Sequence, residues 1–209
     1  EIAQCLVGSE MCIRDSYHTM YDPCCGSGTI LIEGAMMAHN IAPGINRNFE
    51  CDRWGFIPEK AWIQERERCH DIIKTDTDFV AFGSDINFHA LELTMANAKR
   101  IKVDKFLRLE TADIKDFNPT TEKGTLITNP PYGERMLDVK TAKNIYHIMG
   151  EKFVSKHGWS YGIISPDEEF EREFGRKADK RRKLYNGMIK CQYYICLLYT
   201  SPSPRDTER

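Results

Sequence analysis

A glycine turn at residues 22–29, with the sequence DPCCGSGT, places strong limits on how this chain can fold. It follows a short apolar lead and precedes apolar residues at helical spacing over residues 30–38. Gly26 and Gly28 can adopt positive φ and let a ligand approach the backbone closely. The helix that follows presents free N–H groups at its start. We therefore expect a strand–turn–helix unit with a ligand site at the carboxyl end of its strand.

Strand-like and helix-like segments alternate along the rest of the chain. Apolar residues recur at helical spacing over residues 91–98 and 145–153, and Asn186-Gly187 between apolar residues indicates a terminal hairpin within Leu184–Lys190. This order predicts an α/β, Rossmann-like fold with a mostly parallel sheet and a C-terminal antiparallel hairpin. The strands expected after the first one are Phe79–Asp85, Phe106–Thr111, Thr125–Thr128 and Tyr161–Ile164.

Three segments fall outside this alternation. Residues 41–78 are expected to form an insertion, a lid or outer-layer segment with turns and an added helix that starts near Pro58. Residues 1–16 and 195–209 resemble translated sequencing-library adapters, and we expect both to be non-native. The domain itself is expected over residues 17–194, with a first strand that has lost most of its length, since about 5–6 residues are typical.

The composition excludes several classes of protein. The formal net charge is −2, so any nucleic-acid contact must be local or come from another part of the protein. No apolar run approaches the roughly 18 residues that a membrane span requires. The eight cysteines include no C-x-x-C pair, which argues against a zinc site and favours reduced thiols in the cytoplasm. We expect a cytoplasmic protein without metal or membrane anchor.

The residues around the turn select among the possible cofactors. A dinucleotide fingerprint requires a third glycine where this chain has Leu31, and no G-K-[ST] follows at the spacing of a P-loop. Asp22 would repel the phosphates of either ligand, but it could neutralise the ammonium of an amino-acid moiety. These features favour S-adenosylmethionine. Asp85 closes the second expected strand and could accept from the ribose hydroxyls, and Asp113 follows the third and could accept from adenine. Either aspartate alone is more often a helix cap.

A second motif, Asn129-Pro130-Pro131-Tyr132, follows the fourth expected strand. Two prolines stiffen the turn and remove two N–H donors, so the Pro130 carbonyl and the Asn129 side-chain oxygen are both available as acceptors. Together they can orient the two hydrogens of a planar amino group, and Tyr132 can stack on a flipped base. Alone, the motif could be a rigid surface turn. Combined with the glycine turn, it predicts a methyltransferase acting on a planar amino nitrogen.

At these residues the sequence resembles the THUMP-associated RNA guanine-N2 methyltransferases, and most of all their bacterial 23S rRNA branch. The resemblance is carried by Asp22–Gly34 and Asn129–Gly133, with Pro43–Arg47 and Arg182–Gly187 narrowing the branch. It covers residues 17–194 and implies a class I S-adenosylmethionine-dependent methyltransferase. It also implies RNA, expected to be 23S rRNA, delivered by an N-terminal THUMP domain that is missing from this chain.

The resemblance also assigns roles by position. Asn129, Pro130, Pro131 and Tyr132 are expected to hold the guanine amino group. Cofactor contacts are expected from Asp22, Cys24, Gly26, Ser27, Gly28, Thr29, Asp85, Ile86, Asp113, Ile114 and Asn129.

Other interpretations remain open. The same chemistry could serve tRNA guanine, DNA adenine-N6 or a protein glutamine-N5, and the fold could also belong to a non-catalytic RNA-binding module. The basic stretch Arg176–Lys183 could contact phosphates or form a solvated loop. Trp54, Trp62 and Trp159 are expected to pack, and the histidines are expected to be structural or solvated.

Overall fold

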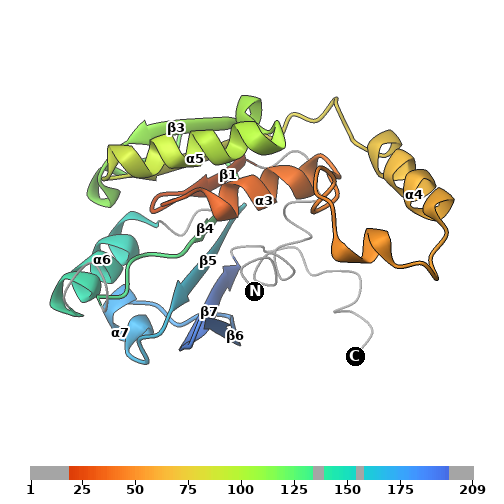
Figure 1. Cartoon of the computed structure of the whole chain (residues 1–209). Helices are drawn as coiled ribbons and strands as arrows, with labels where there is room; N and C mark the ends of the chain where they lie inside the picture. The colour runs from red at the N-terminus through yellow and green to blue at the C-terminus, as the bar shows by residue number, and fades with distance from the viewer. Residues whose placement is uncertain (1–18, 134–138, 154–157, 198–209) are drawn as a thin grey trace, which may run out of the picture.

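The computed structural model describes residues 19–133, 139–153 and 158–197, which form one seven-stranded sheet with helices on both faces (Figure 1). Of the two segments expected to be non-native, residues 1–16 and residues 198–209 of the segment 195–209 lie outside the described residues, whereas Ile195–Leu197 belong to a strand. The strands are Thr19–Asp22 (β1), Ala81–Asp85 (β2), Leu107–Thr111 (β3), Gly124–Thr128 (β4), Trp159–Ser165 (β5), Lys180–Asn186 (β6) and Ile189–Leu197 (β7). The helices are Thr29–Ala38 (α3), Glu59–Asp71 (α4), Phe88–Ile101 (α5), Val139–Lys152 (α6) and Phe170–Phe174 (α7), with short 3₁₀ turns at Glu50–Arg53 (η1), Asp104–Phe106 (η2) and Ile114–Asp116 (η3).

The strand order is β3-β2-β1-β4-β5-β7-β6. Strands β1 to β5 are parallel, while β7 pairs antiparallel with both β5 and β6. The predicted α/β class, the mostly parallel sheet and the C-terminal hairpin are therefore confirmed. The chain leaves β1 in one direction to form β2 and β3 and returns to β4 on the other side. Ligands of such sheets bind where the order reverses, at the carboxyl ends of β1 and β4.

Alternation along the central strands divides the core into two clusters. Met20, Ile127 and Ile164 face the cluster that contains α3 and α5, whereas their neighbours Tyr21, Leu126 and Ile163 face the cluster that contains α6 and α7. Figure 1 shows these two helix pairs on opposite sides of the sheet. Strands buried on both faces read as continuous apolar runs, which is why β4 and β5 could be found from sequence.

The insertion at residues 41–78 contains η1 and α4, and it extends beyond the end of α3 in Figure 1. Pro58 is the N-cap of α4, as expected, but none of the residues of α4 is buried. Trp54 is 51% exposed and stacks on Phe56, so the packing role predicted for it is wrong. Trp159, by contrast, is fully buried, as predicted.

Several boundaries differ from the sequence-based prediction. Strand β2 begins at Ala81 rather than Phe79, and β5 is longer, because it includes Trp159 and Ser165. Helix α7 has only five residues, too few for a helical period, and it was not predicted. The last four residues of the stretch 176–183 begin strand β6, so the loop interpretation is wrong for them. Strand β7 continues three residues past the expected domain end at Tyr194.

The contact between α6 and α7 depends on Gly150. A Cβ atom at this position would lie 2.0 Å from the backbone oxygen of Phe174, which a side-chain rotation cannot relieve. We predict that Gly150→Ala lowers the free energy of unfolding by roughly 1–3 kcal/mol, as overpacking usually does. Urea unfolding measures this loss of stability. Gly55→Ala is the matched control, because nothing lies within 4 Å of its Cβ position. Equal stability of the two variants would contradict the packing assigned to Gly150.

Candidate cofactor and acceptor site

The glycine turn has the backbone that its sequence predicted. Gly26 has φ 53° and Gly28 has φ 78°, and Gly28 is the N-cap of α3. Helix α5 holds the turn from outside, because Thr94 Oγ1 donates to the Gly26 carbonyl at 2.8 Å and Asn97 Nδ2 donates to the Ser27 carbonyl at 3.1 Å. A Cβ at Gly28 would lie 2.3 Å from Thr94 Cγ2, so a larger residue does not fit there. Contacts with α5 thus hold the backbone of the turn in place.

Asp22, at the end of β1, is only 1% exposed. Its Oδ1 accepts from Thr128 Oγ1 at 2.7 Å and from the Cys24 backbone N–H at 3.1 Å. Burial nevertheless raises the pKa of this carboxyl to about 7, because desolvation outweighs the two hydrogen bonds. A cationic group bound next to Asp22 would favour the ionised form. This environment suits the ammonium of an amino-acid moiety.

The two cysteines of the turn remain thiols. Burial raises the pKa of Cys25 to about 12 and raises that of Cys24 well above its usual value, and Asp22 adds to both shifts. A protonated thiol is a weak nucleophile and a small apolar group. Neither cysteine is therefore suited to act as a nucleophile. Both can line a ligand site as small apolar groups.

Asp85, at the end of β2, is bound to the turn and to the following helix. Its Oδ2 accepts from the Gly26 N–H at 2.9 Å, and its Oδ1 accepts from the Asn87 N–H at 2.9 Å. A carboxylate has about four acceptor positions, so two remain for other donors. The neighbouring Ile86 is 74% exposed at the same edge. The structure thus places Asp22, the turn and Asp85 around one region, as the sequence analysis expected.

Asp113 lies at the N-terminal end of η3, after β3. It accepts from the Lys115 N–H at 3.0 Å and forms an ion pair with Lys115 Nζ at 3.4 Å. Its neighbour Ile114 is buried in the core cluster with Tyr21 and Leu126. Asp113 is therefore partly engaged as a helix cap, and the Ile114 side chain packs in the core. Contacts of either residue with adenine stay predictions.

The acceptor loop begins at Asn129, directly after β4. Tyr132 Oη donates to Asn129 Oδ1, and Asn186 Nδ2, from the end of β6, donates to Tyr132 Oη at 3.3 Å. Burial raises the pKa of Tyr132 well above its usual value, which keeps the hydroxyl protonated and able to donate. Pro130 is buried. The carboxamide of Asn129 is thereby oriented, with one lone pair of Oδ1 used and the other available.

Thr128 joins the two halves of the site. It is the last residue of β4, it precedes Asn129, and its hydroxyl donates to Asp22 on the adjacent strand. The turn and the acceptor loop therefore lie at neighbouring strand ends. Sequence analysis missed Thr128, Thr94, Asn97 and Asn186. A hydroxyl residue directly before Asn129 was the available signal for Thr128, whereas the other three act across 54 or more residues of sequence.

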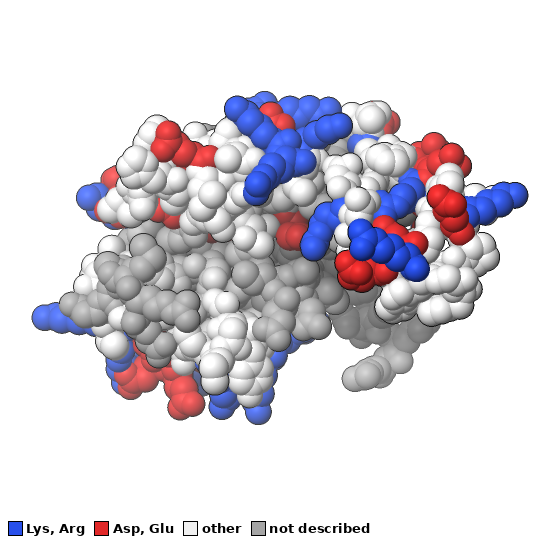
Figure 2. Space-filling view, in the orientation of Figure 1, with Lys and Arg blue, Asp and Glu red and all other residues white. Residues whose placement is uncertain are grey.

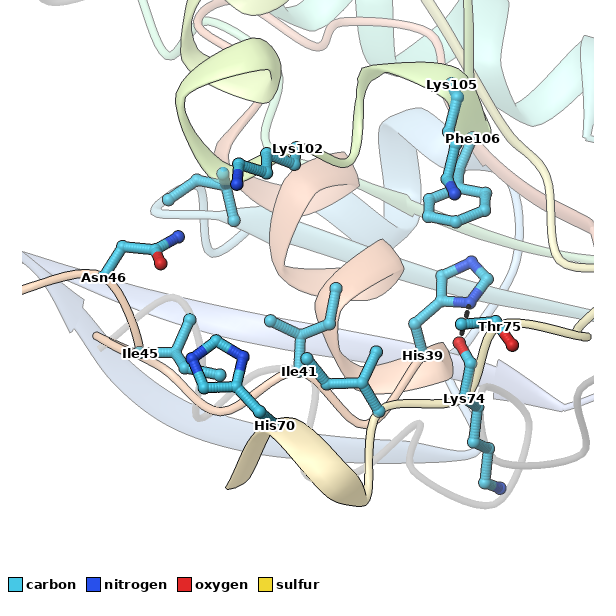
Figure 3. A pocket seen from close by; sticks show the side chains of 12 residues that line it. His39, Ile41, Ile45, Asn46, His70, Lys74, Thr75, Lys102, Lys105 and Phe106 are labelled. Carbon is cyan, nitrogen blue, oxygen red and sulfur yellow. Dashed lines mark hydrogen bonds between the residues drawn. The ribbon is translucent and has the colours of Figure 1, made fainter. Parts of the chain in front are cut away.

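Cavities lie both beside the site and away from it. One of about 480 Å³ adjoins Asp22 and Pro23 on the sheet face between Phe82 and Phe117. Another of about 190 Å³ lies at the far end of α3, lined by residues that include His39, Ile41, His70 and Lys102 (Figure 3).

His39 in the second cavity has a structural role. Its ring stacks on Phe106 with centroids 3.5 Å apart, and Nδ1 lies 3.1 Å from the Lys74 carbonyl (Figure 3). Burial lowers its pKa, which favours the neutral ring. This agrees with the structural role predicted for the histidines.

A comparison with protein families matches the chain to a methyltransferase domain, in agreement with the geometry of the turn and of the acceptor loop. Residues 1–195 match the family described as the RMKL-like methyltransferase domain. The chain belongs to this family. Within the described residues, no helix is long and apolar enough to cross a membrane, and no group of three metal-ligating side chains occurs.

Two bacterial relatives share somewhat more than a third of their aligned residues with this chain. The chain is 37% identical over 187 residues to "Putative RNA methyltransferase YpsC" of Bacillus subtilis, covering 90% of this chain and 49% of that protein. It is 36% identical over 197 residues to "Ribosomal RNA large subunit methyltransferase K/L" of Shewanella amazonensis, covering 92% of this chain and 28% of that protein. The chain thus spans about half or less of the length of these relatives.

Solved structures identify the cofactor. SMU.472, crystallised in complex with SAH, superposes with a TM-score of 0.83 at 38% identity, covering 90% of this chain and 49% of that one. A predicted N6-adenine-specific DNA methylase of Listeria monocytogenes gives a TM-score of 0.79 at 34% identity, covering 86% and 46%. The chain is an S-adenosylmethionine-dependent methyltransferase domain of a family that includes RNA methyltransferases.

The raised pKa of Asp22 predicts how the stability of the folded protein depends on pH. Between its ordinary value of 3.8 and about 7, the folded protein keeps a proton that the unfolded chain has lost. The free energy of unfolding should therefore fall as pH rises through this range, by at most ~1.4 kcal/mol per pH unit from this group, and level off above it. Asp22→Asn should remove this contribution, because an amide cannot titrate.

Urea unfolding of the ligand-free protein at intervals between pH 4 and pH 8 measures the effect. The difference in stability between wild type and Asp22→Asn isolates Asp22 from other titrating groups. Asp71→Asn, an exposed acid on α4, is the control and should leave the wild-type pH profile unchanged. If the stabilities of wild type and Asp22→Asn change with pH in the same way, the pKa of Asp22 is not raised.

Proposed function

We propose that this domain transfers a methyl group from S-adenosylmethionine to the exocyclic N2 amino group of guanine in RNA, most directly 23S rRNA. The observation that carries the proposal is the coupling of the two motifs through Thr128, whose hydroxyl binds Asp22 at 2.7 Å while its own chain continues into Asn129. This arrangement supports a methyl donor and an amino acceptor at adjacent strand ends.

The cofactor supplies the methyl group on a sulfonium when it is bound. Asp22 would accept from its ammonium, the Gly26–Gly28 backbone would lie along its methionine part, and Asp85 would accept from its ribose hydroxyls. The rigid turn and the two spare acceptor positions of Asp85 fit those groups. Asp113, Ile86 and the backbone of Ile114 are the proposed surroundings of the adenine.

The acceptor side works by position and electrostatics. The remaining lone pair of Asn129 Oδ1 and the Pro130 carbonyl accept the two hydrogens of the amino group, which fixes the nitrogen with its lone pair toward the methyl group. The nitrogen would gain positive charge on accepting the methyl group. The two fixed oxygens stabilise that charge until a proton leaves to solvent. A general base is not required before the attack.

Tyr132 has two proposed roles, one for its hydroxyl and one for its ring. Its hydroxyl, held by Asn186, orients the carboxamide of Asn129, and its ring contributes a flat surface beside the base. Pro131 stiffens the loop between them. Part of the Tyr132 ring packs against the core beneath the hairpin, so any stacking uses the outer part of the ring.

The choice of RNA rests on relatives. Both named relatives above are RNA methyltransferases by name, and the K/L protein is named for the large ribosomal subunit. The choice of guanine rests on the resemblance carried by Pro43–Arg47 and Arg182–Gly187. We propose further that a THUMP domain elsewhere in the full-length protein binds the RNA, and that the enzyme acts in the cytoplasm, where ribosomes assemble.

A second candidate is methylation of adenine N6. The Listeria structure carries that description at 34% identity, and the same pair of acceptors could hold an adenine amino group. The two candidates share the transfer step and differ in the base that enters. Mass spectrometry of digested nucleic acid distinguishes N2-methylguanine from N6-methyladenine directly.

We predict that Asn129→Ala lowers kcat by roughly 100-fold or more, because it removes one of the two acceptors that stabilise charge in the transition state. Cofactor affinity should stay within about twofold, since Asp22 and Asp85 are unchanged. The measurements are radiolabelled methyl transfer to rRNA by the full-length protein and calorimetric titration with S-adenosylhomocysteine. Asn144→Ala, the same substitution at an exposed position on α6, is the control and should retain activity. Full turnover by Asn129→Ala would disprove the assigned role.

A further inference from the structure

The end of the β6–β7 hairpin extends past the sheet on the side of the candidate site. Ser165, the last residue of β5, is level with Gln192 of β7 and Lys183 of β6. Three further residue pairs of the hairpin lie beyond that level, ending with Asn186 and Ile189. At about 3.3 Å per residue they project roughly 10 Å past the end of β5. We call residues 184–191 the hairpin tip.

The tip is bound to the acceptor loop. Asn186 Nδ2 donates to Tyr132 Oη at 3.3 Å, and Leu184 and Ile189 pack against the same core cluster as Tyr132. The tip therefore has a fixed position beside the loop that would hold the target base. Anything that contacts the tip lies next to that base.

The outermost side chain of the tip is apolar and has no covering partner in the described part of the chain. Met188 is 99% exposed, and it follows Gly187, whose φ of 63° belongs to the tight turn. Methionine is flexible and polarisable, and apolar side chains of this kind insert between bases in proteins that unstack nucleic acid. An exposed methionine on a rigid turn next to a base-binding loop suits that use.

Positive charge continues from the tip along the edge of the sheet. Alternation along β6 places Lys180, Arg182 and Asn186 on the same face, with Lys180 about 6.6 Å and Asn186 about 13 Å from Arg182 along the strand. Both are exposed, and neither has an ion pair among the described residues, in contrast to Arg181, which pairs with Glu171. Figure 2 shows Lys and Arg side chains along the lower margin, where the hairpin lies in Figure 1.

We propose that this face of the hairpin is where the RNA strand next to the target nucleotide binds. Met188 packs against the neighbouring base and keeps the target out of its stack, while Lys180 and Arg182 contact phosphates of the same strand. This inference rests on the proposed function, because it takes the nucleic acid to be RNA and the target to be held at Asn129. Charge complementarity and the direct bond to the acceptor loop favour a nucleic-acid strand as the occupant of this face, and the proposed function makes that strand RNA.

The salt dependence of RNA binding tests the phosphate contacts, because it would not change if Lys180 and Arg182 had only a structural role. Each contact to single-stranded nucleic acid contributes about 0.7 to the slope of log affinity against log salt concentration. Lys180→Gln with Arg182→Gln should therefore reduce that slope by about 1.4 in binding of an rRNA fragment to the full-length protein. Lys60→Gln with Lys99→Gln, an equal loss of exposed charge on α4 and α5, should leave the slope unchanged. An unchanged slope in the Lys180/Arg182 variant overturns the proposed contacts.

The wedge role is tested by the pairing state of the substrate. Met188→Ser should lower kcat/KM about tenfold for a target base inside a stem, and by less than about twofold for the same base in an unpaired bulge, because less unstacking is then needed. S-adenosylhomocysteine affinity should equal that of wild type. Phe56→Ser removes another large exposed side chain, 78% exposed on the insertion, and should match wild type on both substrates. Equal loss on both substrates, or none, overturns the wedge.

Two further outcomes are distinguishable. If the Lys180/Arg182 variant shows the expected change in slope but wild type methylates another base, the guanine assignment fails while the hairpin contact stands. If Met188 of the full-length protein resists peroxide oxidation without RNA present, another protein segment covers the tip, and the RNA contact is overturned.

Discussion

The hydrogen bond between Thr128 and the buried carboxyl of Asp22 is the interaction on which the site depends. It joins the ends of β1 and β4, the two strands between which the sheet order reverses. The same carboxyl also accepts from Cys24 in the turn, so one group fixes both the backbone of the glycine turn and the start of the acceptor loop. Because water is excluded, its charge depends on what binds beside it.

A second layer of contacts holds these elements from outside. Helix α5 binds the turn through Thr94 and Asn97, and the hairpin binds the acceptor loop through Asn186. Donor and acceptor sides are thus supported by different parts of the chain, with Asp22 and Thr128 as their common point.

Much of the fold and of the site could be predicted because the signals are local. Gly26 and Gly28 define the turn, Asn186-Gly187 defines the hairpin, and apolar runs define β4 and β5. The unpredicted features arise from tertiary contacts. Thr94 shows its role only when α5 lies against the turn, and Trp54 is exposed because the insertion extends away from the sheet. Helix α7 is simply too short to leave a period in the sequence.

The exposed cations of β6 also affect how copies of the protein approach one another. Among the described residues, strand β6 lies at the border of the sheet and has no strand partner on its outer side, so its backbone groups could accept a strand from another molecule. Lys180, Arg182 and Lys183 place like charges along that border, so two copies approaching edge to edge repel each other. The feature that gives the hairpin its affinity for a polyanion would thus also keep the protein from polymerising through its open sheet edge.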